Sequence, residues 1–67
     1  MGDNKIPEVL KELRIQNGMT QAQFSKKLNI ARQTYSAYER GVRIPDLDLI
    51  KNVAELYDVS LDWLVLG

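Results

Sequence analysis

The sequence predicts an all-α fold in which five short helices form one compact domain over residues 1–67. Apolar residues recur at three- and four-residue spacing in segments of helical length, and no segment alternates apolar and polar residues as a half-buried strand does. Helix-start and helix-stop residues separate these segments and leave connections of three to five residues. A chain of this length forms at most one domain with a small core.

The first expected helix covers residues 6–17. Its apolar stripe consists of Ile6, Val9, Leu10 and Leu13. Pro7 suits a first helical turn, and Gly18 can take the left-handed conformation that ends a helix.

The second helix, expected over residues 21–28, has the clearest start signal in the chain. Thr20 can act as N-cap and Gln23 can complete a capping box, while Met19 and Phe24 have the spacing of a hydrophobic staple. Asn29 tolerates the left-handed conformation, so residues 29–31 predict a tight turn before the next helix.

The third helix is expected over residues 32–40, with Gly41 at its end. Tyr35 and Tyr38 share one face of this helix and are expected in the core. Ala31 stands at the N-cap, where it offers no side-chain oxygen to the helix.

Two further helices follow the linker "VRIP". Asp46 can cap the fourth helix and Asp58 ends it; Ser60 can cap the short fifth helix. The residues expected to point inward from the fourth helix are Leu47, Ile50, Val53, Ala54 and Tyr57.

The composition excludes most enzyme classes. The chain has no cysteine and no histidine, so it lacks thiolate nucleophiles, imidazole bases and the usual zinc ligands. The serines at 25, 36 and 60 have no evident activating base. No apolar run approaches the ~20 residues of a membrane span. We expect a cytoplasmic protein that is not an enzyme and needs no cofactor, metal or membrane.

Charge is segregated along the chain although the net charge is zero. Residues 20–45 carry a net charge of +4, and residues 46–67 carry −4. A polyanion such as DNA would therefore be attracted by residues 20–45 and repelled by residues 46–67. Lys26 and Lys27 contribute to the positive region, although they also fit an ordinary solvated helix surface.

One face of the third helix is shallow and polar. Gln33, Ser36, Ala37 and Arg40 gather there, opposite the two tyrosines. A capped helix, a tight turn and a second helix with such a face form the arrangement of a helix-turn-helix, here over about residues 20–40. By periodicity alone, the same face also fits a plain solvated surface.

Nearly the whole chain resembles the Cro and phage-repressor type of helix-turn-helix domain, also called XRE-like or lambda-repressor-like. The segments that carry the resemblance are "GMTQAQFSKKL", "YERG", the proline at 45 and "VSLDWL", in this order and spacing. The resemblance implies a transcriptional regulator that binds double-stranded DNA, with the third helix in the major groove and the second across the backbone.

Individual DNA contacts follow from the resemblance together with the chemistry of the side chains. Amide and guanidinium groups can pair with base edges, and small side chains let the helix approach them. The expected base-contacting residues are Arg32, Gln33, Ser36 and Ala37. The expected backbone contacts are Gln21, Arg40 and Arg43, with Gln21 assisted by the helix dipole.

The resemblance also implies a structural ion pair between Arg14 and Glu39. Glu39 lies beside Tyr35 at the edge of the inward face, where a carboxylate needs a partner, and Arg14 flanks the apolar stripe of the first helix. Two positions depart from the pattern. Ala31 replaces the usual Ser or Thr cap, and Ser25 stands where alanine is common.

Three functional interpretations remain open at this point. The first is a repressor that binds an inverted-repeat operator as a homodimer, paired through the apolar C-terminal residues Trp63, Val65 and Leu66. The second is a protein-binding module, such as an antitoxin or adaptor component. The third is the N-terminal DNA-binding piece of a larger regulator.

Overall fold

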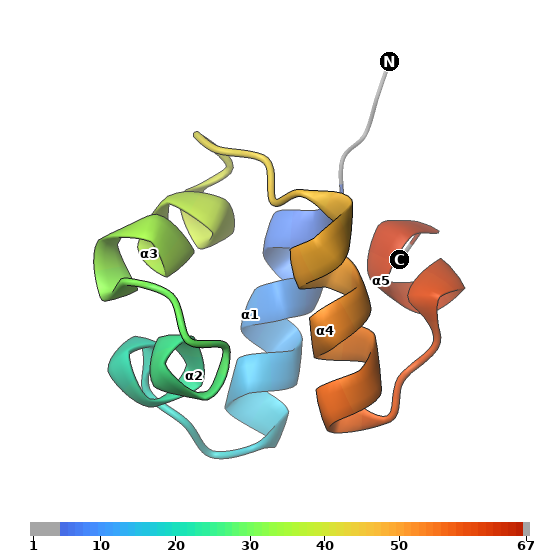
Figure 1. The fold of residues 1–67 in the computed structure, drawn as a ribbon, viewed down its shortest axis with the longest axis horizontal. Helices are drawn as coiled ribbons and strands as arrows, with labels where there is room; N and C mark the ends of the chain where they lie inside the picture. Colours follow the sequence, from blue (N-terminus) through green and yellow to red (C-terminus); the bar gives the residue numbers. More distant parts are fainter. Residues whose placement is uncertain (1–4, 67) are drawn as a thin grey trace.

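The computed structural model describes residues 5–66, and this part of the chain is helical without any strand (Figure 1). The all-α prediction is confirmed. The helices are α1 (Ile6–Gln16), α2 (Gln21–Lys27), α3 (Arg32–Arg40), α4 (Leu47–Tyr57) and α5 (Leu61–Leu66). The predicted ends of the first two helices were one residue too far along the chain, because Asn17 and Leu28 are their C-caps.

The predicted capping box at the start of α2 is present. The backbone N–H of Gln23 donates to Thr20 Oγ1 over 3.1 Å, and the backbone N–H of Thr20 donates to Gln23 Oε1 over 2.9 Å. α3 begins differently, because Ala31 has extended N-cap geometry but makes no side-chain cap. The first turns of α2 and α3 therefore differ, because only α2 has a side chain that accepts from its free backbone N–H groups.

The caps predicted for the last two helices also form. Asp46 Oδ1 accepts a hydrogen bond from the backbone N–H of Leu49 over 2.9 Å at the start of α4. Ser60 Oγ accepts from the backbone N–H of Trp63 over 3.0 Å at the start of α5. Each side chain satisfies a backbone donor that the helix itself leaves unpaired.

Each of the first four helices is followed, within two residues of its end, by a residue with left-handed backbone geometry. These residues are Gly18, Asn29, Gly41 and Asp58, with φ angles of 66°, 59°, 75° and 54°. After each one, the next backbone N–H donates to a carbonyl five residues back, as in the 3.1 Å bond from Ile30 to Ser25. This Schellman geometry turns the chain sharply, and at Asn29 it produces the short connection between α2 and α3.

α1 lies between two pairs of helices, with α2 and α3 on one side and α4 and α5 on the other (Figure 1). It packs against α3 and α5, while α2 packs on α3 and α4 on α5. Phe24 from α2 joins the two sides. Its ring stacks on Tyr57 of α4 at a centroid distance of 5.0 Å and lies tilted against Tyr35 of α3 at 5.1 Å.

The inward face of α4 differs from the prediction at two positions. Leu47 is 63% exposed, whereas Leu49 is buried and belongs to the core. Buried Leu49, Ile50 and Val53 define a face from which Leu47 lies about 100° away on the helical wheel. The sequence pattern alone placed Leu47 with Ile50 because the two are three residues apart.

Candidate nucleic-acid interface

α3 separates a buried aromatic face from a polar one. Tyr35 is fully buried and Tyr38 is 8% exposed, so both tyrosines belong to the core as predicted. The residues predicted to contact bases lie elsewhere on the helix: Arg32 and Gln33 are exposed, and Ser36 and Ala37 are half-buried. Burial of the tyrosines fixes which side of α3 remains available to a partner.

The cationic side chains near this face differ in their contacts with the rest of the protein. Arg40 Nε lies 3.4 Å from Ser36 Oγ and donates a long hydrogen bond to it. Arg43 is exposed in the linker after Gly41. Gln33 makes no side-chain hydrogen bond within the described residues 5–66, so both ends of its amide are available to a partner.

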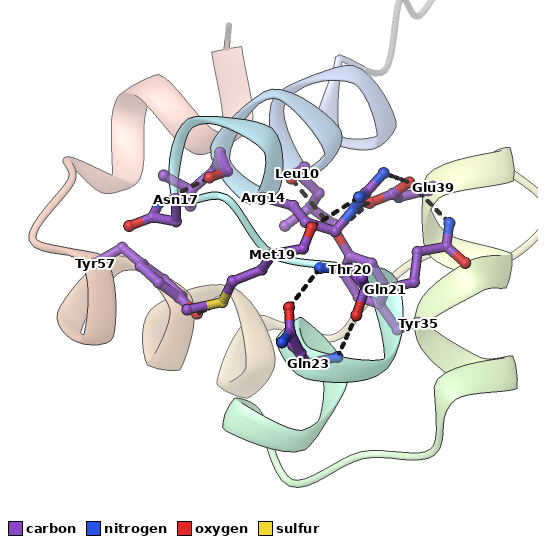
Figure 2. A network of polar contacts seen from close by, with 11 residues as sticks. Leu10, Arg14, Asn17, Met19, Thr20, Gln21, Gln23, Tyr35, Glu39 and Tyr57 are labelled. Atoms are coloured by element: carbon purple, nitrogen blue, oxygen red, sulfur yellow. Dashed lines mark hydrogen bonds and ion pairs between the residues drawn. The ribbon is translucent and has the colours of Figure 1, made fainter.

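Arg14 and Glu39 form the predicted ion pair, which joins α1 to α3 (Figure 2). Arg14 Nε donates to Glu39 Oε2 over 2.7 Å, and Arg14 Nη2 donates to Glu39 Oε1 over 3.2 Å. The two side chains are only 15% and 5% exposed. Arg14 Nη1 also donates to the carbonyl oxygen of Met19 over 3.0 Å, which fixes the connection between α1 and α2. A paired, bidentate geometry of this kind compensates the burial of both charges.

Two more side chains donate to the Glu39 carboxylate (Figure 2). The Tyr35 hydroxyl donates to Oε2, and it also lies 3.3 Å from the Leu10 carbonyl oxygen. Gln21 Nε2 donates to Oε1 over 3.0 Å. From the sequence, Gln21 was predicted to contact the DNA backbone and Tyr35 to lie in the core. Neither of their hydrogen bonds to Glu39 was predicted. Only the four-residue spacing of Tyr35 and Glu39 could have indicated one of them.

This arrangement keeps Glu39 ionised. Burial by itself raises the pKa of the Glu39 carboxyl, but hydrogen bonds from Arg14, Tyr35 and Gln21 outweigh burial and hold that pKa below its usual value. The hydrogen bond to Glu39 raises the pKa of the Arg14 guanidinium. Burial, followed by the bond to Glu39, raises the pKa of the Tyr35 phenol. Every partner thus stays in the protonation state that the network needs.

The apolar C-terminal residues predicted to form a dimer interface are only partly exposed to solvent. Trp63 is half-buried and packs against the core, while Val65 and Leu66 are 42% and 75% exposed. Leu61, one helical turn before Val65, is 39% exposed and was not predicted. A second set of exposed apolar side chains lies in the linker after α3 and at the start of α4, at Val42, Ile44 and Leu47.

Within residues 5–66, no cluster of three or more acidic, cysteine or histidine side chains could bind a metal ion. None of the described helices is both long enough and apolar enough to cross a lipid bilayer.

Comparison with known proteins decides the family. A helix-turn-helix family model matches residues 10–64. The chain belongs to this helix-turn-helix family. The regulator YqaE of Bacillus subtilis is 45% identical over 60 residues, which are 90% of this chain and 52% of YqaE. The transcriptional regulator ImmR of the same organism is 45% identical over 56 residues, which are 84% of this chain and 44% of ImmR. This chain spans about half the length of these relatives.

A solved transcriptional regulator from Listeria innocua has the same fold. It superimposes with a TM-score of 0.88 and 26% sequence identity, covering 98% of this chain and 62% of the Listeria chain. The resemblance to Cro and phage-repressor type regulators is therefore confirmed. The family match and the names of these relatives point to a DNA-binding transcriptional regulator rather than an enzyme.

Proposed function

We propose that residues 1–67 form a single helix-turn-helix domain that represses transcription by binding an inverted-repeat operator as a homodimer. In the bound state, α3 lies in the major groove and α2 crosses the backbone. The observation that carries this proposal is the free polar face of α3, in which the exposed Gln33 amide makes no internal hydrogen bond within the described chain. Such a regulator acts on the DNA of the cytoplasm.

Base recognition is assigned to four residues of this face, Arg32, Gln33, Ser36 and Ala37. The Gln33 amide can pair with adenine N6 and N7, and Arg32 can pair with guanine O6 and N7. Ser36 and Ala37 are small and half-buried, so the helix axis can come close to the base edges. Ala37 can also contact a thymine methyl group.

Backbone contacts are assigned to Gln21, Arg40 and Arg43, which lie on three different segments. Arg43 is exposed beyond the end of α3, and Arg40 lies in its last turn. The net charge of +4 over residues 20–45 is attracted to the phosphate backbone. The net charge of −4 over residues 46–67 is repelled by it. Charge therefore favours one orientation on the duplex.

Repression is the simplest consequence of such binding. A domain of 31 × 25 × 21 Å that occupies the major groove covers most of one helical turn and excludes other proteins from it. The regulatory direction can be tested by transcription in vitro from a promoter that carries the selected operator: repression lowers the amount of transcript as the protein is added.

Selection of bound sequences from random duplex DNA tests specific recognition, and an enriched palindrome is the expected result. Gln33→Ala should then weaken operator binding by about 1 to 3 kcal/mol and leave non-specific binding nearly intact, whereas Arg43→Ala should weaken both. Affinity should fall with salt, with a slope of about 0.9 per phosphate neutralised. If no sequence is enriched, the protein-binding module becomes the better interpretation.

The homodimer is proposed to form through α5, at Trp63, Val65 and Leu66. A single recognition helix buries little surface, and a two-fold pair reads two half-sites about one DNA turn apart. Because Trp63 also packs on the core, Leu66→Glu is the cleaner test. Sedimentation equilibrium at micromolar concentration should give twice the 7.7 kDa mass for the wild type and a lower mass for Leu66→Glu.

Leu47→Glu is the matched control for this experiment, because Leu47 is 63% exposed and lies outside α5. It should leave the dimer intact. If Leu47→Glu dissociates the dimer and Leu66→Glu does not, the interface lies beside the linker after α3. A wild type that stays monomeric at hundreds of micromolar, both free and on DNA, contradicts the dimer altogether.

A further inference from the structure

We propose that Glu39 is a positioning residue for DNA binding, because it orients the Gln21 amide toward the phosphate backbone. This role is additional to the ion pair with Arg14, and it rests on the proposed function, in which Gln21 contacts DNA. The ion pair and the Gln21 bond use the same carboxylate, so one side chain links the stability of the domain to the geometry of a contact.

The geometry of the Gln21 amide supports this role. Gln21 is the first residue of α2 and is half-buried beside α3. Its Nε2 atom donates to Glu39 Oε1 over 3.0 Å, and its oxygen points away from the carboxylate (Figure 2). An ionised carboxylate only accepts hydrogen bonds, so it can hold the nitrogen end of an amide but never the oxygen end. Glu39 therefore selects one of the two amide orientations.

This selection matters because a phosphate also only accepts hydrogen bonds. The amide nitrogen carries two hydrogens, of which one bonds Glu39 and the other remains for a phosphate oxygen. Without the carboxylate, the amide can rotate about its terminal torsion, which is broad and nearly two-fold, and present its oxygen to the phosphate instead. Half of the population would then face the backbone with a repulsive group.

Glu39 is itself fixed by its other donors. Arg14 reaches both carboxylate oxygens from α1, and the Tyr35 hydroxyl reaches Oε2 from α3. The Gln21 amide on α2 is therefore positioned relative to α3, the helix proposed to read bases. Arg43 has no such support, because it lies exposed in the linker and makes no ion pair within residues 5–66. It provides a matched contact that does not depend on Glu39.

The first test measures side-chain amide motion in the free protein by ¹⁵N NMR relaxation. The Gln21 NH₂ group should be nearly as rigid as the backbone, and the Gln33 NH₂ group should be mobile. This measurement needs only the wild type, so it does not depend on the folding of a variant. If the Gln21 and Gln33 amides are equally mobile, the positioning role is overturned.

The second test is a double-mutant cycle on DNA affinity, measured for folded protein at a temperature where circular dichroism shows every variant to be native. In the wild-type background, Gln21→Ala and Arg43→Ala should each weaken binding to any duplex by about fivefold. In the Glu39→Gln background, the effect of Gln21→Ala should shrink to about two- to threefold, while that of Arg43→Ala stays at about fivefold. A structural role of Glu39 alone would not separate these two contacts.

The outcomes distinguish the positioning role from the function on which it rests. If Gln21→Ala weakens binding by the same factor in both backgrounds, Glu39 does not position Gln21, and DNA binding by this domain still stands. If neither Gln21→Ala nor Arg43→Ala changes the affinity for any duplex, both the proposed DNA interface and the positioning role are wrong.

A second variant covers the case in which Glu39→Gln does not fold. Tyr35→Phe removes another donor to the carboxylate, so it should make the Gln21 amide more mobile in the NMR measurement. An unchanged amide contradicts the positioning role.

Discussion

The junction between α1 and α3 and the junction between α4 and α5 are stabilised in different ways. At the first, Glu39 accepts hydrogen bonds from three side chains and forms an ion pair with Arg14. At the second, α4 packs on α5, and Ile50, Val53 and Leu64 from these helices belong to the buried apolar core. Within residues 5–66, no ion pair reaches α4 or α5.

The difference follows from what each side of the molecule does in the proposed function. A buried polar network has a defined geometry, since its donors and acceptors must match in position and direction. The hydrophobic effect is non-directional, so apolar packing sets no bond directions between the side chains in contact. In the proposed function, the polar junction lies where α2 and α3 would keep a fixed relation to DNA, and the apolar junction lies where only a stable support is needed. The two should therefore respond differently to mutation and to pH.

The largest expected effect is at the apolar junction. Leu64 is fully buried between α5 and the rest of the core, so Leu64→Ala should lower the free energy of unfolding by about 3 to 5 kcal/mol. For so small a domain this is much of the total. Leu66→Ala, which changes a 75% exposed leucine in the same helix, should stay within about 0.5 kcal/mol. Urea unfolding measures both, and equal losses would show that α5 does not dock through Leu64.

The next effect concerns the polar junction. Arg14→Met leaves the Glu39 carboxylate buried without its cation, so it should cost about 2 to 3 kcal/mol, less than the ~3 to 5 kcal/mol of a fully buried pair. Glu39→Gln should cost less, because the Arg14 guanidinium that it leaves without an anion is more exposed than Glu39 and keeps its bond to the Met19 carbonyl oxygen. Chemical denaturation of both variants and of the double mutant gives the coupling energy. Coupling below about 0.5 kcal/mol would mean that the two side chains act independently.

Lowering the pH should weaken the polar junction and leave the apolar junction unchanged, so the two can be distinguished without any mutation. The pKa of Glu39 is lower in the folded protein than its ordinary value of 4.5, so ionised Glu39 stabilises the fold above pH 4.5. That stabilisation is lost progressively as the pH falls below 4.5 through the folded-state pKa. Unfolding free energies measured from pH 7 to pH 2 should show this loss in the wild type and in Leu64→Ala. The loss should be smaller in Glu39→Gln, and equal losses in all three would assign it to other carboxyl groups.

The features that the sequence predicted correctly are mostly local. Thr20 and Gln23 lie three residues apart, and the helix-ending conformations at Gly18 and Asn29 depend on the residue type itself. The error at Leu47 was of another kind, because the inward direction of α4 depends on the helices against which it packs. The ion pair between Arg14 and Glu39 was predicted from the family resemblance and not from helical periodicity.

The bond between Gln21 and Glu39 could not be predicted from the sequence. The two residues are 18 positions apart and lie on different helices, so no helical spacing relates them. Their contact depends on how α2 packs against α3 and on the direction that Arg14 gives to the carboxylate. The candidate site was therefore predictable as a set of side chains on α3, while its support from α1 and α2 became visible only in the folded structure.

The smallest expected effect concerns the missing side-chain cap at the start of α3. Ala31 has the extended backbone of an N-cap residue, with φ −67° and ψ 146°, but no side-chain oxygen to accept the N–H groups of the first turn. Ala31→Ser should therefore raise the free energy of unfolding by about 1 kcal/mol, and Thr20→Ala should lower it by a similar amount through loss of the capping box of α2. Thermal unfolding measures both. Because the cap satisfies the backbone of α3 and touches neither junction, the gain from Ala31→Ser should be the same at pH 7 and at pH 3. A gain that disappears in acid would show that the start of α3 is coupled to Glu39, and the two ends of α3 could then no longer be treated as independent.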